Sequence, residues 1–284
     1  MPSTDRAGEG IELSFAHLSG VPLPTDEYVR AAAAAGVGTV GLRLQPMRQG
    51  EATTDIVRDR GARRRVERAL ADTGLRVHDV EVMALAPQRR AADYAAFLDV
   101  AAELRVSRVN VQTPGAAGSE AVDLLGEAQQ EAAQRGIICS FEFVSWLAVP
   151  SLGEALALLD QVGGDFEVVP DLLHLHRTGG GIDDLLVLPE RRMTWLQLTD
   201  VAPGATPEVE EQIRQARHER VTPGEGVLDI RRLLAEVRRP MTVSLEVPND
   251  VLVERIGAAE HMRRLVEAAR ALIALGVEPR TPVP

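Results

Sequence analysis

Residues 137–144 read IICSFEFV, and residues 242–247 read TVSLEV. Each run is short and rich in β-branched or aromatic residues, which is typical of a strand buried on both faces of a sheet. A glycine precedes the first run, and an Ala- and Leu-rich stretch with helical periodicity follows it after a short connection. A buried strand followed by a helix indicates a βα unit, from which parallel sheets are built.

The same unit recurs along the rest of the chain. Strand-forming runs alternate with Ala-, Leu- and Arg-rich helical stretches, and no Gly/Ser/Pro-rich linker interrupts them. The predicted strands cover residues 11–18, 39–44, 76–83, 108–112, 137–144, 166–171, 194–200 and 242–247. Eight such units in 284 residues predict an α/β fold, a single-domain (β/α)₈ TIM barrel with its core at about residues 11–276 and flexible tails.

The alternative architecture is an open, doubly wound sheet. That fold expects a G-x-G-x-x-G turn after its first strand, whereas this chain reads SFAHLSGVPLP there. The first turn therefore argues against a dinucleotide-binding fold. The longest connection, at about residues 201–227, follows the seventh strand, and in a barrel we expect such an insertion to lie over the active site.

Composition argues against nucleic acid and membranes as partners of this chain. The net charge is −11, and an acidic chain repels nucleic acid, so we expect no nucleic-acid partner. Cys139 is the only cysteine, so no disulfide can form within the chain. No run approaches the ~18 consecutive apolar residues of a membrane span, and the first residues are polar. We expect no membrane contact, a cytoplasmic location, and a homodimer or homotetramer as alternative assemblies.

Polar residues interrupt four consecutive predicted strands near their carboxyl ends, where barrel active sites lie. They are Glu142, Asp171, Gln197 and Glu246. Burying a lone carboxylate is costly, and three at one mouth would repel each other, whereas a divalent cation removes that cost. Oxygen ligands suit Mg²⁺ or Mn²⁺. The alternative is that each carboxylate is paired with an arginine.

Five motifs occur in order along the chain: FEFVSW, PDLLHLHRTGG, TWLQLTD, ARHERVTPGEG and VSLEVPND. As an ordered set they resemble the xylose isomerase-like TIM-barrel superfamily, which includes sugar phosphate isomerases and epimerases. The resemblance covers most of the chain and is strongest over residues 142–249. It implies one bound metal, Mn²⁺ or Mg²⁺ with Co²⁺, Fe²⁺ and Zn²⁺ as alternatives, held by Glu142, Asp171, Gln197 and Glu246.

The resemblance also implies a reaction class. Sugar epimerases of the family usually carry His on strand seven, whereas Gln197 resembles the 3-dehydroshikimate dehydratase branch. Metal-assisted enolate formation suits a polyhydroxylated keto substrate, with Glu142 and Glu246 moving protons and His174 orienting the substrate or protonating a leaving group. We expect an isomerase or epimerase of a sugar or cyclitol-like compound. A dehydratase of a cyclic keto-acid or keto-polyol is one alternative, and a non-catalytic partner subunit is another.

Endonuclease IV, a relative that cuts DNA, uses more metal ions and many more histidine ligands than this chain offers, and the negative charge also argues against it.

Further residues are predicted to line the mouth and bind the substrate. Each lies on a predicted strand or near its end, or in a long connection, where a polar or aromatic side chain can contact a ligand. Arg217 and His218 form a cluster with Arg220 that is suited to a carboxylate or phosphate, although a solvated helix end explains the cluster equally well. The predicted substrate contacts are His17, Arg43, Glu81, Gln112, Trp146, Arg217 and His218.

Overall fold

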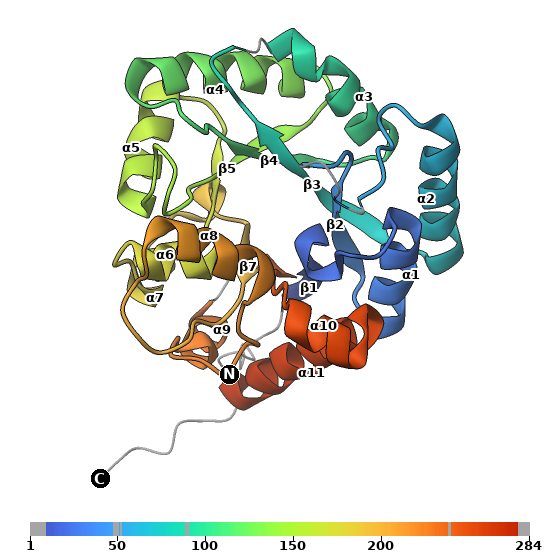
Figure 1. Cartoon of the computed structure of the whole chain (residues 1–284). Helices are drawn as coiled ribbons and strands as arrows, with labels where there is room; N and C mark the ends of the chain where they lie inside the picture. The colour runs from blue at the N-terminus through green and yellow to red at the C-terminus, as the bar shows by residue number, and fades with distance from the viewer. Residues whose placement is uncertain (1–9, 48–50, 52, 89–90, 238–239, 278–284) are drawn as a thin grey trace, which may run out of the picture.

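The computed structural model describes residues 10–47, 51, 53–88, 91–237 and 240–277. Its eight strands are all parallel and follow the order β6-β5-β4-β3-β2-β1-β8-β7. An isolated bridge between Asp171 and Gln197 joins the two outer strands of that order. The sheet therefore curves into a nearly closed barrel, which confirms the predicted (β/α)₈ fold (Figure 1). The strands are β1 (Ile11–Phe15), β2 (Thr39–Arg43), β3 (Arg76–Ala84), β4 (Arg108–Gln112), β5 (Ile138–Glu142), β6 (Glu167–Val169), β7 (Trp195–Leu198) and β8 (Met241–Leu245).

Helices surround the barrel and fill the connections. The α-helices are α1 (Thr25–Ala35), α2 (Arg60–Thr73), α3 (Ala95–Glu103), α4 (Gly118–Ala133), α5 (Leu152–Val162), α6 (Leu172–Arg177), α7 (Ile182–Leu186), α8 (Val209–His218), α9 (Ile230–Glu236), α10 (Asp250–Ile256) and α11 (Ala258–Val277). The 3₁₀ helices are η1 (His17–Gly20), η2 (Ala91–Tyr94) and η3 (Glu190–Arg192). No helix that the structure describes combines the length and apolar character needed to cross a bilayer.

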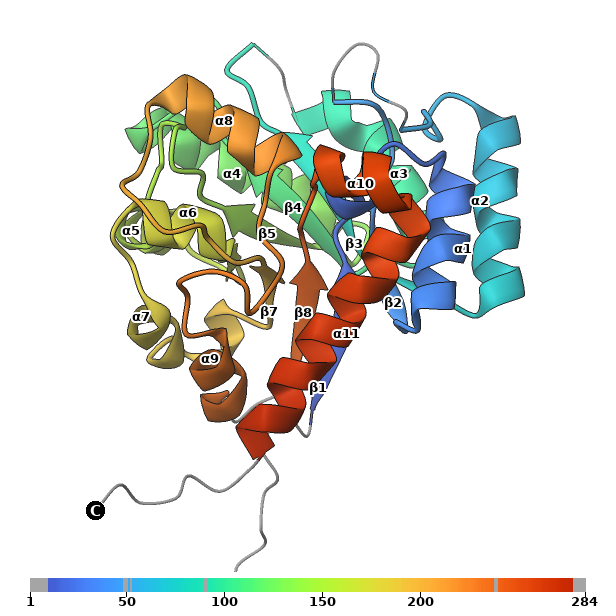
Figure 2. The ribbon, with the colours of Figure 1, turned by 60° about the horizontal axis from the view of Figure 1, so that its bottom comes forward.

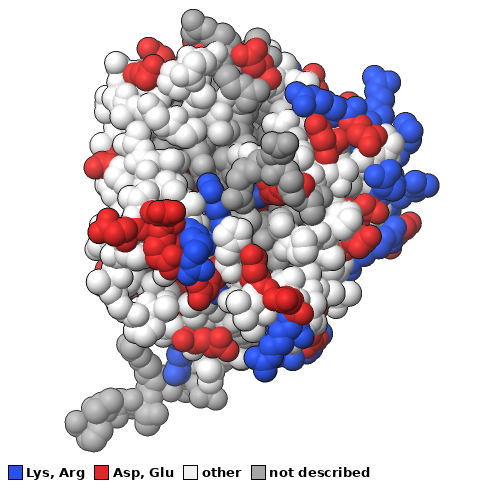
Figure 3. Space-filling model, viewed as in Figure 1, with Lys and Arg blue, Asp and Glu red and all other residues white. Residues whose placement is uncertain are grey.

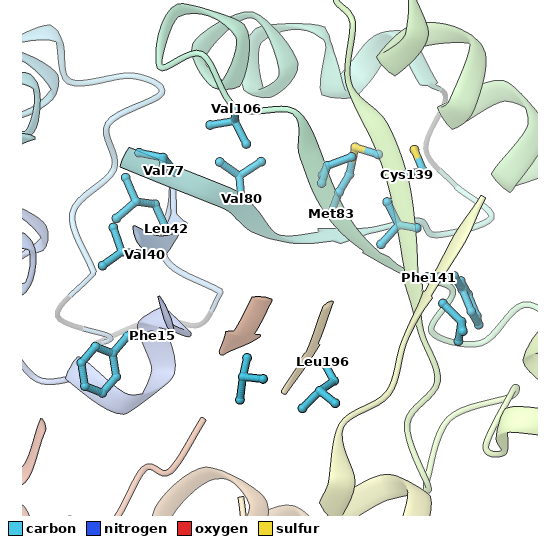
Figure 4. Close-up of a cluster of buried hydrophobic side chains, with 14 of the residues drawn as sticks. Phe15, Val40, Leu42, Val77, Val80, Met83, Val106, Cys139, Phe141 and Leu196 are labelled. Carbon is cyan, nitrogen blue, oxygen red and sulfur yellow. The ribbon is translucent and has the colours of Figure 1, made fainter. Parts of the chain in front are cut away.

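The period of two in each strand sorts its side chains between two environments. In β5, Cys139 and Phe141 pack in the apolar layer between the strands and the outer helices (Figure 4). The alternate residues, Ser140 and Glu142, belong to the polar barrel interior, where Ser140 Oγ accepts a hydrogen bond from Trp195 Nε1. One face of the strand thus builds the core, and the other face carries chemistry toward the carboxyl end.

Several strands end earlier than the sequence predicts. β1 stops at Phe15 because the chain turns into η1 at His17, and β6 and β8 stop before Asp171 and Glu246. These residues leave the regular ladder at the same end of the barrel. Figure 2 shows that β8 points toward this end and that α8 and α10 lie over it. The predicted tails fall on residues 1–9 and 278–284, outside the described ranges.

Candidate functional site

A cavity of about 250 Å³ opens at the carboxyl ends of the strands. Its lining combines carboxylates, cationic side chains, one imidazole and one indole. The lining residues used below are Arg43, Gln112, Glu142, Trp146, His174, Arg217, Arg220 and Glu246. Figure 3 looks onto this end and shows a hollow near the centre with basic and acidic side chains around it. The long connection after β7 contributes α8, which confirms that this insertion covers the mouth.

Three potential metal ligands converge beside this cavity. Glu142, Asp171 and His174 each offer a ligand atom, and these atoms all lie within 4.8 Å of one another. Glu142 is the last residue of β5, while Asp171 follows β6 and caps α6 by accepting a hydrogen bond from the Leu173 amide. His174 lies one helical turn after Asp171, so both side chains share a face. The ends of β5 and β6 and the first turn of α6 thus place these three side chains close together.

Asp171 and Glu246 are joined by a buried arginine. Arg220 Nη1 lies 2.6 Å from Asp171 Oδ2, and its Nη2 lies 3.0 Å from Glu246 Oε2. Burial alone would raise the pKa of Asp171, but Arg220 and His174, together with hydrogen bonds to the carboxylate, outweigh burial and lower the pKa. The pKa of Glu246 is raised well above its usual value, because burial outweighs Arg220. The arginine-pairing alternative therefore describes part of this cluster.

Glu142 has no arginine of its own among the described residues. Its Oε2 accepts hydrogen bonds from Asn110 at 2.6 Å and Gln112 at 2.9 Å. Burial, followed by repulsion from Asp171, raises the pKa of Glu142 to about 7. Neutral amides stabilise a carboxylate less than a full positive charge does. Of the carboxylates in this cluster, Glu142 is therefore the one whose negative charge is least compensated by the protein, so a bound cation would stabilise its charged form.

Gln197 completes the predicted ligand set and supports its fit to a metal. It is buried, pairs with Asp171 through the β-bridge, and its Oε1 finds no hydrogen-bond partner among the described residues. An unsatisfied buried carbonyl oxygen is costly unless something binds it. Carboxylate and amide oxygens with one imidazole form a donor set that suits Mn²⁺, Mg²⁺, Zn²⁺ or a similar ion. The residues present thus fit a divalent metal.

The opposite side of the mouth, from β1 to β3, is self-neutralised. The guanidinium of Arg43 is hydrogen-bonded to Glu51 and lies 4.0 Å from Glu81. Glu81 Oε1 also accepts the His17 amide at 2.6 Å. Burial raises the pKa of Glu81 to about 7 despite Arg43. Three predicted substrate contacts therefore form one network.

The imidazole of His17 has a defined protonation state. Its Nδ1 accepts a hydrogen bond from the Arg43 amide at 2.8 Å, and the ring stacks on Tyr28 at 4.3 Å. Burial, with help from Arg43, lowers the pKa of His17 to about 3, so the ring is neutral near pH 7. The proton then sits on Nε2, which has no partner among the described residues.

The remaining predicted contacts divide into two groups. Trp146 packs edge-on against the His174 ring at 4.8 Å, and both it and Arg217 line the cavity. His218 lies next to Arg217 in α8 but pairs with Asp250 at 2.9 Å on the exposed side of the helix. The structure thus brings Trp146 and Arg217 to the site and leaves His218 outside its lining.

Sequence reasoning missed three residues of this site. Arg220 was noted only as part of a basic cluster, yet it contacts two predicted ligands. Ser145 and Gln212 were not singled out, and they form hydrogen bonds leading away from His174. A signal existed for Arg220, because buried carboxylates demand a cation and the long connection offers several arginines. No local pattern distinguishes Ser145 or Gln212, since their contacts join distant segments.

Comparison with protein families gives one match that spans most of the chain. The model described as a xylose isomerase-like TIM barrel matches residues 29–274. No curated protein matches the sequence.

Solved structures share the fold at low sequence identity. The IOLI protein with a bound zinc atom aligns with a TM-score of 0.71 and 15% identity, over 93% of this chain and 98% of that one. D-allulose 3-epimerase from Methylomonas sp. aligns with a TM-score of 0.67 and 16% identity, over 94% and 98%. The probable 3-DHS dehydratase AsbF from Bacillus anthracis aligns with a TM-score of 0.71 and 13% identity, over 91% and 98%. At such identities these likenesses establish the fold.

Proposed function

The chain belongs to the xylose isomerase-like TIM-barrel family, and we propose that it is a divalent-metal-dependent isomerase or epimerase of a polyhydroxylated keto compound. In this proposal Glu142, Asp171, Gln197 and Glu246 hold the metal, and the substrate occupies the adjacent cavity. The D-allulose 3-epimerase among the structures of the same fold supports this class of reaction.

One observation carries the proposal. Glu142 and Glu246 come from different strands, line the same cavity, and both have raised pKa values. The pKa of Glu142 is raised to about 7, so near neutral pH this carboxyl can both take and return a proton. A second glutamate with a raised pKa at the same cavity suits a reaction in which a proton leaves one position of the substrate and returns at another.

The residues have separable tasks in such a reaction. The bound metal would polarise the substrate carbonyl and so stabilise the negative charge of an enolate. One of the glutamates takes the proton from the carbon next to that carbonyl, and the other returns a proton to the opposite face or the neighbouring carbon. Asn110 and Gln112 hold Glu142 in place by hydrogen bonds to its Oε2. Arg220 keeps Asp171 ionised for the metal.

A dehydratase is the second candidate, favoured by Gln197 and by the fold shared with a probable 3-DHS dehydratase. Proton removal is common to both reactions, but here a hydroxyl group on the next carbon would leave. Arg217, which lines the cavity, would then bind an acidic group of the substrate.

Metal content and solvent deuterium uptake test both candidates together. Purified protein is analysed for metal and incubated in D₂O with a panel of keto-sugars and 3-dehydroshikimate-like acids, and products are followed by NMR. We expect one equivalent of metal and deuterium at the carbon beside the carbonyl. An exchanged isomer or epimer supports the first candidate, and an unsaturated product supports the second.

Glu246→Gln should lower the exchange rate by roughly 10²–10⁴-fold, the usual contribution of a general acid or base. Glu219→Gln is a matched control, because this exposed glutamate directly follows α8, pairs with Arg214 and does not line the cavity. A protein that binds no metal after soaking and exchanges no proton would overturn the proposal and leave a non-catalytic partner subunit.

A further inference from the structure

We infer that the outer face formed by α2, α3 and α4 is a homodimer interface, in which an arginine stripe on α2 of one copy pairs with a carboxylate stripe on α4 of the other. The inference goes beyond the proposed function and does not depend on the metal site. The arginine stripe consists of Arg60, Arg64 and Arg68, and the carboxylate stripe consists of Glu120, Asp123 and Glu127.

The arginine stripe follows one exposed face of α2. Its members are spaced i, i+4 and i+8, and none has a carboxylate partner among the residues that the structure describes. The nearby Asp59 carboxylate is used to cap the amides of Gly61 and Ala62. Like charges at this spacing repel each other, and Arg60 also lies at the positive end of the helix dipole. The stripe therefore weakens α2 unless negative charges face it.

The carboxylate stripe on α4 has the complementary pattern. Its members are spaced i, i+3 and i+7, are exposed, and have no cationic partner within the described part of the chain. The exposed faces of α8 and α11 instead carry neighbouring charges of opposite sign, which pair within each helix. An acidic polymer would satisfy only the arginine stripe, whereas a second copy of this chain satisfies both stripes at once.

The two stripes flank α3 on the outside of the barrel. Figure 1 shows α2, α3 and α4 in succession around the sheet, and Figure 3 shows basic side chains along the edge where α2 lies. Arg63 Nη1 of α2 lies 2.6 Å from Glu103 Oε2 of α3, and Arg135 Nε, just after α4, lies 2.7 Å from Asp99 Oδ1 of α3. The exposed side chains of α3 are thus Ala96 and two carboxylates that are neutralised within the chain. This helix can lie at the centre of an interface without adding repulsion.

A two-fold axis that runs along the barrel axis and passes in front of α3 aligns the stripes. It places α2 of each copy opposite α4 of the other, so both contacts form twice in a closed, isologous dimer. The outer helices of a barrel run back from the carboxyl ends of the strands, so the facing helices have the same direction. At about 1.5 Å per residue, the arginine stripe rises about 12 Å and the carboxylate stripe about 10.5 Å. The pairs are then Arg60 with Glu120, Arg64 with Asp123, and Arg68 with Glu127.

Sedimentation velocity of charge-reversed, full-length protein tests this pairing. We expect a wild-type dimer at low salt that dissociates near 1 M NaCl, where the Debye length falls to about 3 Å. Arg64→Glu and Asp123→Arg should each raise the dimer Kd about tenfold or more, because each turns two attractive pairs of the dimer into repulsive ones. Arg264→Glu is the matched control, since it makes the same charge change on the exposed face of α11, and it should keep the wild-type Kd.

Mixing the two weakened variants gives the sharpest measurement. In a mixed dimer the Arg64→Glu copy faces the Asp123→Arg copy, so one contact has its charges exchanged and the other is native. We expect the equimolar mixture to dimerise with a Kd close to that of the wild type, although neither variant does so alone. A monomeric wild type at low salt, or single variants that dimerise as tightly as the wild type, would sink the inference. A mixture that does not recover, with both variants folded by circular dichroism, would refute the pairing of α2 with α4.

Discussion

Two buried glutamates on adjacent strands differ in how the protein neutralises their charge. Glu167, at the amino end of β6, accepts hydrogen bonds from Arg108 Nε at 3.0 Å and Nη2 at 3.2 Å, and from Ser140 Oγ at 3.2 Å. Glu142, at the carboxyl end of β5, receives only amide N–H groups. One end of the barrel therefore neutralises its charge within the protein, whereas the other leaves charge for a ligand. On this criterion Glu167 is predicted to be structural and Glu142 to be functional.

The largest effect on stability is expected at the neutralised end. Arg108→Met removes both guanidinium contacts and leaves Glu167 charged in the barrel interior. Breaking a buried pair typically costs 3–5 kcal/mol. Arg108 is partly exposed, so we expect a loss of about 2–4 kcal/mol in the free energy of unfolding. Urea denaturation measures it.

The double variant Arg108→Met with Glu167→Gln should recover most of that loss, because it removes the stranded charge as well. Mn²⁺ affinity should be the same in both variants and the wild type. A large fall in affinity in the single variant would mean that the two ends of the barrel are not independent.

At the mouth, removing a buried carboxylate should stabilise the metal-free protein rather than destabilise it. The folded-state pKa of Glu142 is raised from 4.5 to about 7, so the folded protein binds more protons than the unfolded chain between these values. The stability contributed by this group is complete below pH 4.5 and is lost as the pH rises through about 7. Glu142→Gln cannot ionise. Above pH 7 the metal-free variant should therefore be more stable than the metal-free wild type, by on the order of 1–3 kcal/mol.

Thermal or urea unfolding of chelator-treated protein at pH 5 and pH 8 checks this sign. The two proteins should converge at pH 5, and adding Mn²⁺ at pH 8 should reverse their order because only the wild type keeps the carboxylate ligand. A Glu142→Gln variant that is less stable at pH 8 without metal would show that Glu142 is structurally satisfied, as Glu167 is.

The residues at the carboxyl end of the barrel could be predicted from the sequence better than the contacts at its amino end. Glu142, Asp171 and Glu246 stood out as polar residues near the carboxyl ends of apolar strands, and the barrel rule then placed them at one mouth. These predictions worked because they depend on a local sequence pattern and on parallel strand direction. Identifying Arg108 as the partner of Glu167 requires knowing which strands are neighbours, which no local pattern supplies.

Contacts made by the long connection were harder still. Arg220 reaches Asp171 across 49 positions of sequence, and Ser145 reaches Gln212 across 67. Both contacts depend on how the connection after β7, which includes α8, packs over the mouth of the barrel. The outcome for Arg217 and His218 has the same cause, because adjacent residues in a helix face about 100° apart. A basic cluster of three residues in sequence therefore becomes two cavity residues, Arg217 and Arg220, and one surface residue, His218.

The smallest expected effect lies on that surface. His218→Gln removes a contact with Asp250 in which the two side chains are 44% and 68% exposed. Exposed pairs contribute roughly 0–1 kcal/mol, so we expect less than about 0.5 kcal/mol of destabilisation and unchanged substrate binding. Arg217→Gln, one residue earlier, should instead raise the KM of an acidic substrate about tenfold or more, since a charged hydrogen bond contributes about 1.5–3 kcal/mol. Steady-state kinetics on both variants, with a neutral substrate analogue alongside, measures the contrast. An equal rise in KM for the two variants would place His218 at the mouth after all, whereas a rise for neither would assign the cluster to the solvated end of α8.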